Sequence, residues 1–197
     1  MELLLSVCLG VGLSAACGFR IFVPVLIMGM AARSGHLQLA DSFVWIGSTP
    51  ALIGCSVATA LEIGAYYIPW LDNLLDTVAT PAAVVAGIVV TASCVVDLDP
   101  VMRWTLASIL GGGSAAVVQT GTSLLRATSS ATTGGLGNPL VATAEAGGSI
   151  GLSLVSLLMP VIAALLFLSC IGLFTWWWMR RRNRRLTMSA DRSDNAL

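Results

Sequence analysis

Apolar residues along the chain gather in long blocks, not in the short alternating patterns of soluble helices and strands. A helix needs about 20 apolar residues to cross the ~30 Å hydrocarbon core of a bilayer. Five blocks have lengths near or above this value: residues 3–32, 51–68, 81–96, 104–125 and 149–179. The pattern therefore predicts an all-α, polytopic transmembrane helical bundle of about five spans, with residues 1–179 forming the transmembrane domain.

The first and last blocks are longer than one span requires. Thirty helical residues would measure about 45 Å, and Gly18, Arg20 and Pro24 interrupt the first block. We expect this element to be tilted, kinked or broken near Gly18, and a re-entrant form would reverse the side of the N-terminus. In the last block, Pro160 predicts a kink.

Aromatic and basic residues indicate the orientation. The tryptophans flank the apolar blocks, where indole rings prefer the headgroup level: Trp45, Trp70, Trp104 and 176–178. Half of the ten arginines lie between Arg180 and Arg185, directly after the last block. Because basic residues mark the cytoplasmic side, we expect a multi-pass protein of the cell inner (plasma) membrane with its C-terminus in the cytoplasm and Arg33 and Arg103 also inside. Residues 180–197 are Arg-rich and polar, and their composition predicts a disordered tail.

The composition agrees with a membrane protein and excludes several function classes. Hydrophobic residues make up 56% of the 197 residues, charged residues only 10%, and the mean hydropathy is +0.88. The chain has no lysine, which excludes a P-loop lysine and a Schiff-base lysine. With His36 as its single histidine, it cannot build a His-rich zinc site. We expect no cofactor and no nucleic-acid partner.

Small residues recur at a spacing of four, which lets helix backbones approach closely in lipid. Three such series are present: Gly10, Ser14 and Gly18; Ala83, Gly87 and Thr91; Gly147 and Gly151. They predict a tightly packed bundle. Because such faces serve contacts within and between chains equally well, a homo-oligomer is also compatible with the sequence.

Four charged residues stand out because charge inside a membrane costs roughly 2.5–3.5 kcal/mol. Arg20 and Arg126 each follow a glycine-rich stretch, and each precedes a lone glutamate, Glu62 or Glu145. This order is a faint internal repeat of the kind that places transporter sites near the midplane. We expect the arginines to bind an anion, with the glutamates as counter-charges or proton carriers. The alternative is a purely structural role, with Arg20–Glu62 and Arg126–Glu145 as ion pairs.

A second candidate element is the segment from Thr128 to Gly148, which is too apolar and too rich in glycine for an ordinary solvated loop. It predicts an irregular turn that enters a short helix at Pro139, the favoured start of a helix. Free N–H groups at such a start bind anions, assisted by neighbouring hydroxyls. The substrate-binding residues expected here are Thr132, Thr133, Gly134, Gly135 and Asn138. The alternative is a flexible external loop.

Two pairs of aspartates are the remaining candidates: Asp72 and Asp76, Asp97 and Asp99. Such pairs bind divalent cations, and a lipid-modifying metalloenzyme is a third, weaker hypothesis. We expect no metal, because Asp99 before Pro100 fits a helix cap and the five-span topology puts the pairs on opposite sides of the membrane. No other catalytic constellation is present, so we do not expect an enzyme.

Three stretches carry a resemblance to a known family: GLSAACGFRIFVPVLIMGMAARSG (12–35), Glu62 with the segment 69–72, and ATTGGLGNPLVATAE (131–145). Over nearly all of residues 1–170 the chain resembles the bacterial membrane-protein family called domain of unknown function 4126. The second stretch departs from the family pattern, because Tyr66 and Tyr67 stand where an acid and a lysine are expected. The resemblance implies an integral membrane protein of uncharacterised activity and supplies no substrate.

The residues together predict a small transporter or channel-type protein. Its intramembrane site, built from Arg20, Arg126 and the 132–138 turn, would take a small anion or an anionic lipid headgroup. A structural or partner-binding membrane subunit without transport activity is the alternative. The expected partners are membrane lipids.

Overall fold

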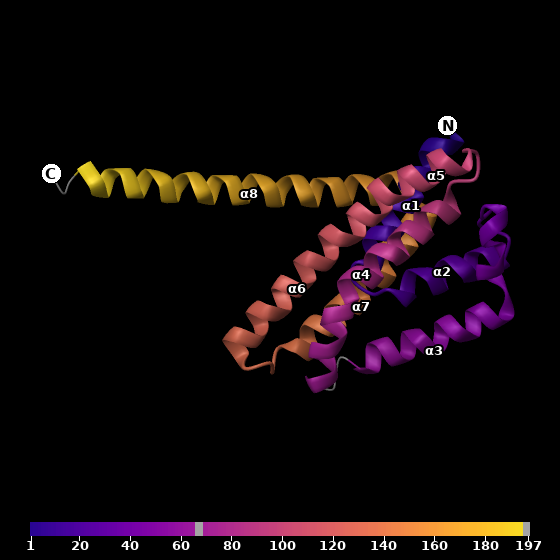
Figure 1. Cartoon of the computed structure of the whole chain (residues 1–197), viewed down its shortest axis with the longest axis horizontal. Coiled ribbons are helices and arrows are strands. Elements are labelled where there is room, and N and C mark those ends of the chain that lie inside the picture. The colour runs from indigo at the N-terminus through magenta and orange to yellow at the C-terminus, as the bar shows by residue number, and fades with distance from the viewer. Residues whose placement is uncertain (66–68, 195–197) are drawn as a thin grey trace. The chain divides into compact units, whose positions relative to one another are not determined.

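The computed structural model describes residues 1–65 and 69–194, with side chains described except at 69–77, 174, 177, 178 and from 181 onward. Every regular element in these ranges is a helix, which confirms the all-α fold (Figure 1). The elements are α1 (Glu2–Cys17), α2 (Phe22–Arg33), η1 (Asp41–Gly47), α3 (Thr49–Ala65), α4 (Pro69–Cys94), α5 (Pro100–Leu106), η2 (Ala107–Gly112), α6 (Gly113–Thr133), α7 (Asn138–Leu158) and α8 (Pro160–Asp194). The chain forms two compact units, Met1–Ala164 and Leu165–Leu197.

Several helices have the length and composition of membrane-embedded segments. Among the described residues, Pro100–Thr133 and Asn138–Leu158 are each long and apolar enough to cross a bilayer. The pair η1 and α3, bent by 63° at its break, would make a third crossing if it acts as one span. Shorter apolar helices accompany them, α1 and α2 included. The apolar helices therefore indicate a membrane-embedded protein. The count of five spans stays a prediction.

The first apolar block is broken, as Gly18 and Arg20 predict. Helix α1 ends at Cys17 and α2 begins at Phe22. Gly10 of α1 lies against Thr91, close to the C-terminal end of α4. Met28 of α2 lies beside that same end, where the Ser93 hydroxyl donates to its sulfur at 3.3 Å. Helix α1 therefore runs away from this end of α4 and α2 returns toward it, so the block forms a helical hairpin. A re-entrant course in the membrane stays a prediction.

Helices α1 and α4 are in close contact through their small residues. The Ser14 hydroxyl lies 2.6 Å from the Gly87 carbonyl oxygen and 2.7 Å from the Thr91 hydroxyl. On its other side, Gly87 abuts η2, since a methyl group added there would lie 2.7 Å from the Gly111 carbonyl oxygen. The tight packing predicted from the first two small-residue series is confirmed.

The third series behaves differently. A methyl group added at Gly147 or Gly151 would meet no atom within 4 Å. The neighbouring Gly148 faces the ring of Phe19 instead, at 3.9 Å from the position of such a methyl group. Helix α7 is rotated so that Gly147 and Gly151 lie on its exposed side and make no close contact among the described residues. Of the two kinds of contact that the spacing allows, only one between chains stays open for them.

The last two predicted elements have different boundaries from those expected. Helix α7 already begins at Asn138, so the helix after the turn is long, not short, and the final block is divided at Met159. Pro160 causes this break because it lacks the N–H that would continue the α7 ladder. Helix α8 then stays helical through Asp194, including polar residues whose composition predicts no regular structure.

Candidate functional site

Arg20 lies in the break between α1 and α2 and reaches the centre of the first unit. The end of α1 lies against α6, because a methyl group at Gly18 would be 2.7 Å from the Ala115 carbonyl oxygen. The Arg20 side chain is only 1% exposed. Its Nη2 donates to the Ala142 carbonyl oxygen of α7 at 3.0 Å. Irregular backbone at this depth is tolerated where protein groups surround it, and here α6 and α7 do so.

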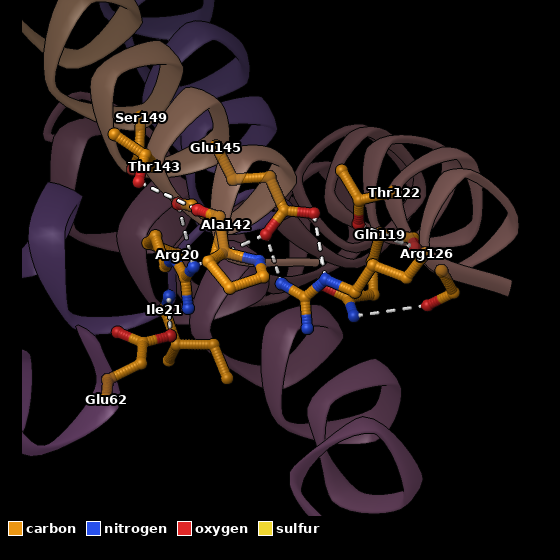
Figure 2. A network of polar contacts seen from close by, with 12 residues as sticks. Arg20, Ile21, Glu62, Gln119, Thr122, Arg126, Ala142, Thr143, Glu145 and Ser149 are labelled. Atoms are coloured by element: carbon orange, nitrogen blue, oxygen red, sulfur yellow. Dashed lines mark hydrogen bonds and ion pairs between the residues drawn. The ribbon is translucent and has the colours of Figure 1, made fainter. Parts of the chain in front are cut away.

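Glu145 of α7 joins the two buried arginines (Figure 2). Arg126 of α6 donates from Nε to Glu145 Oε1 at 3.0 Å and from Nη2 to Oε2. Arg20 Nη2 lies 3.4 Å from the same Oε2. Arg126 and Glu145 are each 4% exposed. The ion pair of Arg126 with Glu145, which the structural alternative expects, is present, and one carboxylate is shared by both guanidinium groups.

Glu62 of α3 binds the start of α2, next to Arg20. Its Oε1 accepts from the Ile21 N–H at 2.7 Å and its Oε2 from the Phe22 N–H at 3.1 Å. Both are free donors at a helix N-terminus, where the helix dipole favours negative charge. The half-buried Glu62 therefore fills an anion position made by the break itself.

Further buried polar residues surround this network and were not predicted from the sequence. Gln119 and Thr122 are each 4% exposed on the same helix as Arg126. Their spacing from it, seven and four residues, places all three on one helix face. On α7, Ser149 donates to the Ala16 carbonyl oxygen at 3.0 Å and ties α7 to α1. The polar spacing on α6 is a signal that the sequence does contain.

The 132–138 turn connects α6 and α7, as expected, but its described hydrogen bonds are local. Gly134 and Gly135 have φ of +63° and +91°, a left-handed conformation that glycine adopts without strain. The Thr133 hydroxyl accepts from the Gly137 N–H at 2.9 Å. Thr132 and Thr133 are exposed, and seven residues of helix separate Thr133 from Arg126, about 10 Å. Anion binding by this turn stays a prediction.

Of the two aspartate pairs, the structure describes the side chains of Asp97 and Asp99. Asp99 caps α5, accepting from the N–H groups of Val101 and Met102 at 3.0 and 3.2 Å, as predicted. The side chains of Asp72 and Asp76 lie outside the described residues, as do Tyr66 and Tyr67. Among the described side chains, no group of three His, Cys, Asp or Glu residues could hold a metal ion.

Comparison with protein families places the chain in a known group. The family model described as Domain of unknown function (DUF4126) matches residues 7–180. The chain belongs to this family. All four charged residues of the DUF4126 network fall within the matched range. Comparison with curated proteins and with solved structures finds no match.

The network has two anion positions, and carboxylates of the chain itself occupy both. One lies between the two arginines and holds Glu145; the other is the N-terminus of α2 and holds Glu62. With two arginines and two glutamates, the formal charges balance. A proton on Glu145 would remove the charge that the guanidinium groups share. An external anion could then take its place without leaving a net charge in the bundle.

Proposed function

We propose that this DUF4126 protein is a small membrane transporter that moves an inorganic or small organic anion together with a proton. The observation that carries the proposal is the carboxylate of Glu145 between the guanidinium groups of Arg20 and Arg126, each under 5% exposed. Two fixed guanidinium groups around one carboxylate form a site of the correct geometry for an oxyanion. Glu145 acts as the resident anion that a substrate replaces.

The break between α1 and α2 supports a transport role. Discontinuous helices with a half-helix N-terminus at the site are a recurring feature of secondary transporters. Here the break places Arg20, and the first N–H groups of α2 hold Glu62. Each half of the chain contributes an arginine and a glutamate in the same order, which favours an origin by an inverted repeat. A cell inner membrane, which carries a proton gradient, suits this mechanism.

In the proposed cycle, Glu145 takes up a proton and its neutral carboxyl group leaves the arginines. The anion then binds to Arg20 and Arg126 in its place. Release of the anion on the other side allows Glu145 to lose its proton and return to the guanidinium groups. The net result is one anion and one proton moved in the same direction.

A second candidate function is a structural membrane subunit without transport activity. The enclosure of all three groups favours it, because an ion triad buried from solvent can hold helices together with no ligand. The two candidates differ in what happens when Glu145 loses its charge permanently. An anion site then accepts an external anion, whereas a scaffold is only weakened.

The test is anion-dependent stability of Glu145→Gln, with Glu2→Gln as the control because Glu2 is exposed at the start of α1. Chloride, nitrate and inorganic phosphate are added to each purified variant, and the melting temperature is followed. We expect at least one anion to stabilise Glu145→Gln and to leave the control unchanged; at 100 times its Kd a ligand contributes about 2.7 kcal/mol. Equal responses of both variants to all three anions would favour the scaffold.

Transport itself is measured in proteoliposomes that contain a pH-sensitive dye. With the wild-type protein, an inward gradient of the stabilising anion should acidify the lumen beyond the rate in empty liposomes. Glu145→Gln should move the anion without acidification, because the proton carrier is missing. Arg126→Gln should lose both movements, whereas Arg180→Gln, at an exposed position, should retain them. Lumen acidification by Glu145→Gln at the wild-type rate would contradict the mechanism.

A further inference from the structure

The segment η1 has the features of a helix that lies at a membrane surface. Phe43 and Ile46 are buried, at 6% and 2% exposure, while Val44 and Trp45 are 60% and 62% exposed. Phe43 also contacts the ring of Trp104, with 6.0 Å between the ring centroids. One face of η1 is thus anchored on the bundle. The other presents an apolar residue and an indole ring, which is typical of interfacial segments.

A cavity of about 680 Å³ lies between η1 and the end of α2. This size falls within the roughly 300–1,000 Å³ of small-molecule sites. Leu37, Leu39 and Val96 supply part of its apolar lining, and Trp45 also lines it. The polar lining comes from four side chains: Arg33, Gln38, Asp41 and Ser48. The cavity therefore combines an apolar wall with a few polar groups, as ligand sites do.

Arg33 and Asp41 bring opposite charges to this one cavity without pairing. Arg33 donates from Nη1 to the Thr49 hydroxyl at 2.6 Å, which uses one of its five N–H donors. The ion pairs of the described side chains do not include Arg33 with Asp41. Both side chains are exposed. A guanidinium group and a carboxylate that line one cavity without pairing offer a contact to each charge of a zwitterion.

We propose that this cavity binds the headgroup of a zwitterionic phospholipid, with the phosphate on Arg33 and the amine on Asp41. The remaining N–H donors of Arg33 suit phosphate oxygens. Asp41 accepts from the ammonium group, and Trp45 contacts the glycerol and the first methylene groups of the lipid. An anionic headgroup without an amine would meet the same guanidinium group but would be repelled by Asp41. The site therefore selects phosphatidylethanolamine over phosphatidylglycerol.

The test uses native mass spectrometry of the full-length protein in detergent. Short-chain phosphatidylethanolamine, phosphatidylcholine and phosphatidylglycerol are titrated separately, and the bound lipids are counted. We expect the wild-type protein to bind phosphatidylethanolamine about tenfold more tightly than phosphatidylglycerol, the effect of one charge-assisted hydrogen bond. Equal affinity for all three lipids would overturn the proposal, since the cavity would then not distinguish headgroups with an amine from those without one.

Single substitutions at Arg33 and Asp41 separate the contributions of the two charges to lipid binding. Arg33→Gln should weaken all three phospholipids by about tenfold, as loss of a charge-assisted bond predicts. Asp41→Asn should remove the preference for phosphatidylethanolamine and leave phosphatidylglycerol bound as well as before, or better. Thr49→Ala keeps the charge of Arg33 and removes its hydroxyl partner, so any loss should be smaller than in Arg33→Gln. Arg103→Gln, which changes an arginine outside the cavity lining, should bind like the wild type.

Folding failure is recognised by the elution volume and helical circular dichroism of each variant. If Arg33→Gln does not fold, Asp41→Asn decides the proposal alone: unchanged lipid preference in this folded variant would refute it. The proposal does not depend on anion transport, because Glu145→Gln should retain the wild-type lipid preference whether or not it transports.

Discussion

At the scale of single residues, the central feature is one buried carboxylate shared by two guanidinium groups. Charge inside a bilayer persists only where it is paired, and Glu145 supplies the partner for both Arg20 and Arg126. Removing one member of a buried pair costs more than the pair contributes, because an uncompensated charge stays behind. The network should therefore tolerate losing matched charges better than losing Glu145 alone.

This asymmetry gives a direct prediction for unfolding in detergent without added anion. Glu145→Gln should lower the free energy of unfolding by about 3–5 kcal/mol, the range for breaking a buried pair. Adding Arg126→Gln should recover part of that loss, since one unpaired guanidinium group then disappears. The measurement is thermal unfolding of the two single variants and the double variant. Additive losses would show that the two groups are not energetically coupled.

At the scale of elements, the start of α2 depends on a residue from another helix. Glu62 accepts from the N–H groups of Ile21 and Phe22, a capping function that neighbouring side chains within the helix usually perform. This contact also fixes the backbone that carries Arg20. The break between α1 and α2 is therefore held from outside, by α3.

Glu62→Gln tests this capping role. The amide has one oxygen acceptor in place of two charged ones, so we expect a loss of about 0.5–2 kcal/mol, the range for helix caps. Faster hydrogen exchange at Ile21 and Phe22 should accompany it, while the amides in the middle of α4 stay protected. Glu2→Gln, at an exposed residue, serves as the control. Unchanged exchange at both amides would show that α3 does not hold the break.

Glycine has opposite roles on different helices of the bundle. A methyl group at Gly87 would lie 2.7 Å from the Gly111 carbonyl oxygen and from the Ala115 methyl carbon, whereas one at Gly147 would meet nothing within 4 Å. The same residue type thus permits close backbone contact on α4 and leaves open surface on α7. Sequence spacing alone does not separate the two cases, because it does not reveal how each helix is rotated.

Gly87→Ala should destabilise the protein by about 1–3 kcal/mol, as expected for overpacking against backbone. The matched variant Gly147→Ala should be neutral or stabilising by up to about 1 kcal/mol, because alanine restricts the unfolded chain and favours helix. Thermal unfolding of both purified variants measures the difference. Equal effects of the two substitutions would contradict the packing described for α4 and η2.

At the scale of the whole molecule, the sequence predicts the fold class well and the chain path less well. Apolar blocks indicate helices at nearly every correct place, and the break near Gly18 follows from Gly18 and Arg20 interrupting the block. Pro160 predicts a kink in the last block, but not the full division at Met159, because the apolar run on both sides of it resembles one continuous span. Hydropathy gives the length of an apolar block but not the path of the chain through it. It therefore does not show that α2 runs back toward the end of the bundle where α1 begins.

The candidate site shows the same limits. The sequence does identify the four charged residues, because a charge in an apolar block is costly and is kept only where it has a partner or a function. They are Arg20, Arg126, Glu62 and Glu145. Their meeting around one carboxylate is a tertiary property that no spacing specifies. Arg33 and Asp41 are ordinary loop and helix-end residues in the sequence, and only the fold places them on one cavity.

These corrections change the topology in a testable way. If the hairpin of α1 and α2 enters the membrane without crossing it, the first block contributes no crossing, and the last block is divided between α7 and α8. Crossings by α3, α4, the continuous helix 100–133, α7 and α8 would again number five. The N-terminus would still lie outside and the arginine cluster after Trp178 inside. Arg33 and Arg103, however, would change from the cytoplasmic to the external side, because both follow the returning end of α2 and α4.

We therefore predict that an epitope inserted after Gly35 is accessible from outside intact cells. An epitope after Gly135 and one at the C-terminus should be accessible only after permeabilisation, since the α6–α7 turn lies at the opposite end of the bundle from Arg33. Five clustered arginines outweigh two isolated ones in setting orientation. If the epitope after Gly135 is inside as expected but the one at the C-terminus is accessible from outside, only one of α7 and α8 crosses the membrane. If those after Gly35 and Gly135 agree, one of the three helices between them (α3, α4 or residues 100–133) does not cross. An epitope at the N-terminus tests the first block: accessibility opposite to that of the epitope after Gly35 would show that this block crosses, and would refute the hairpin of α1 and α2.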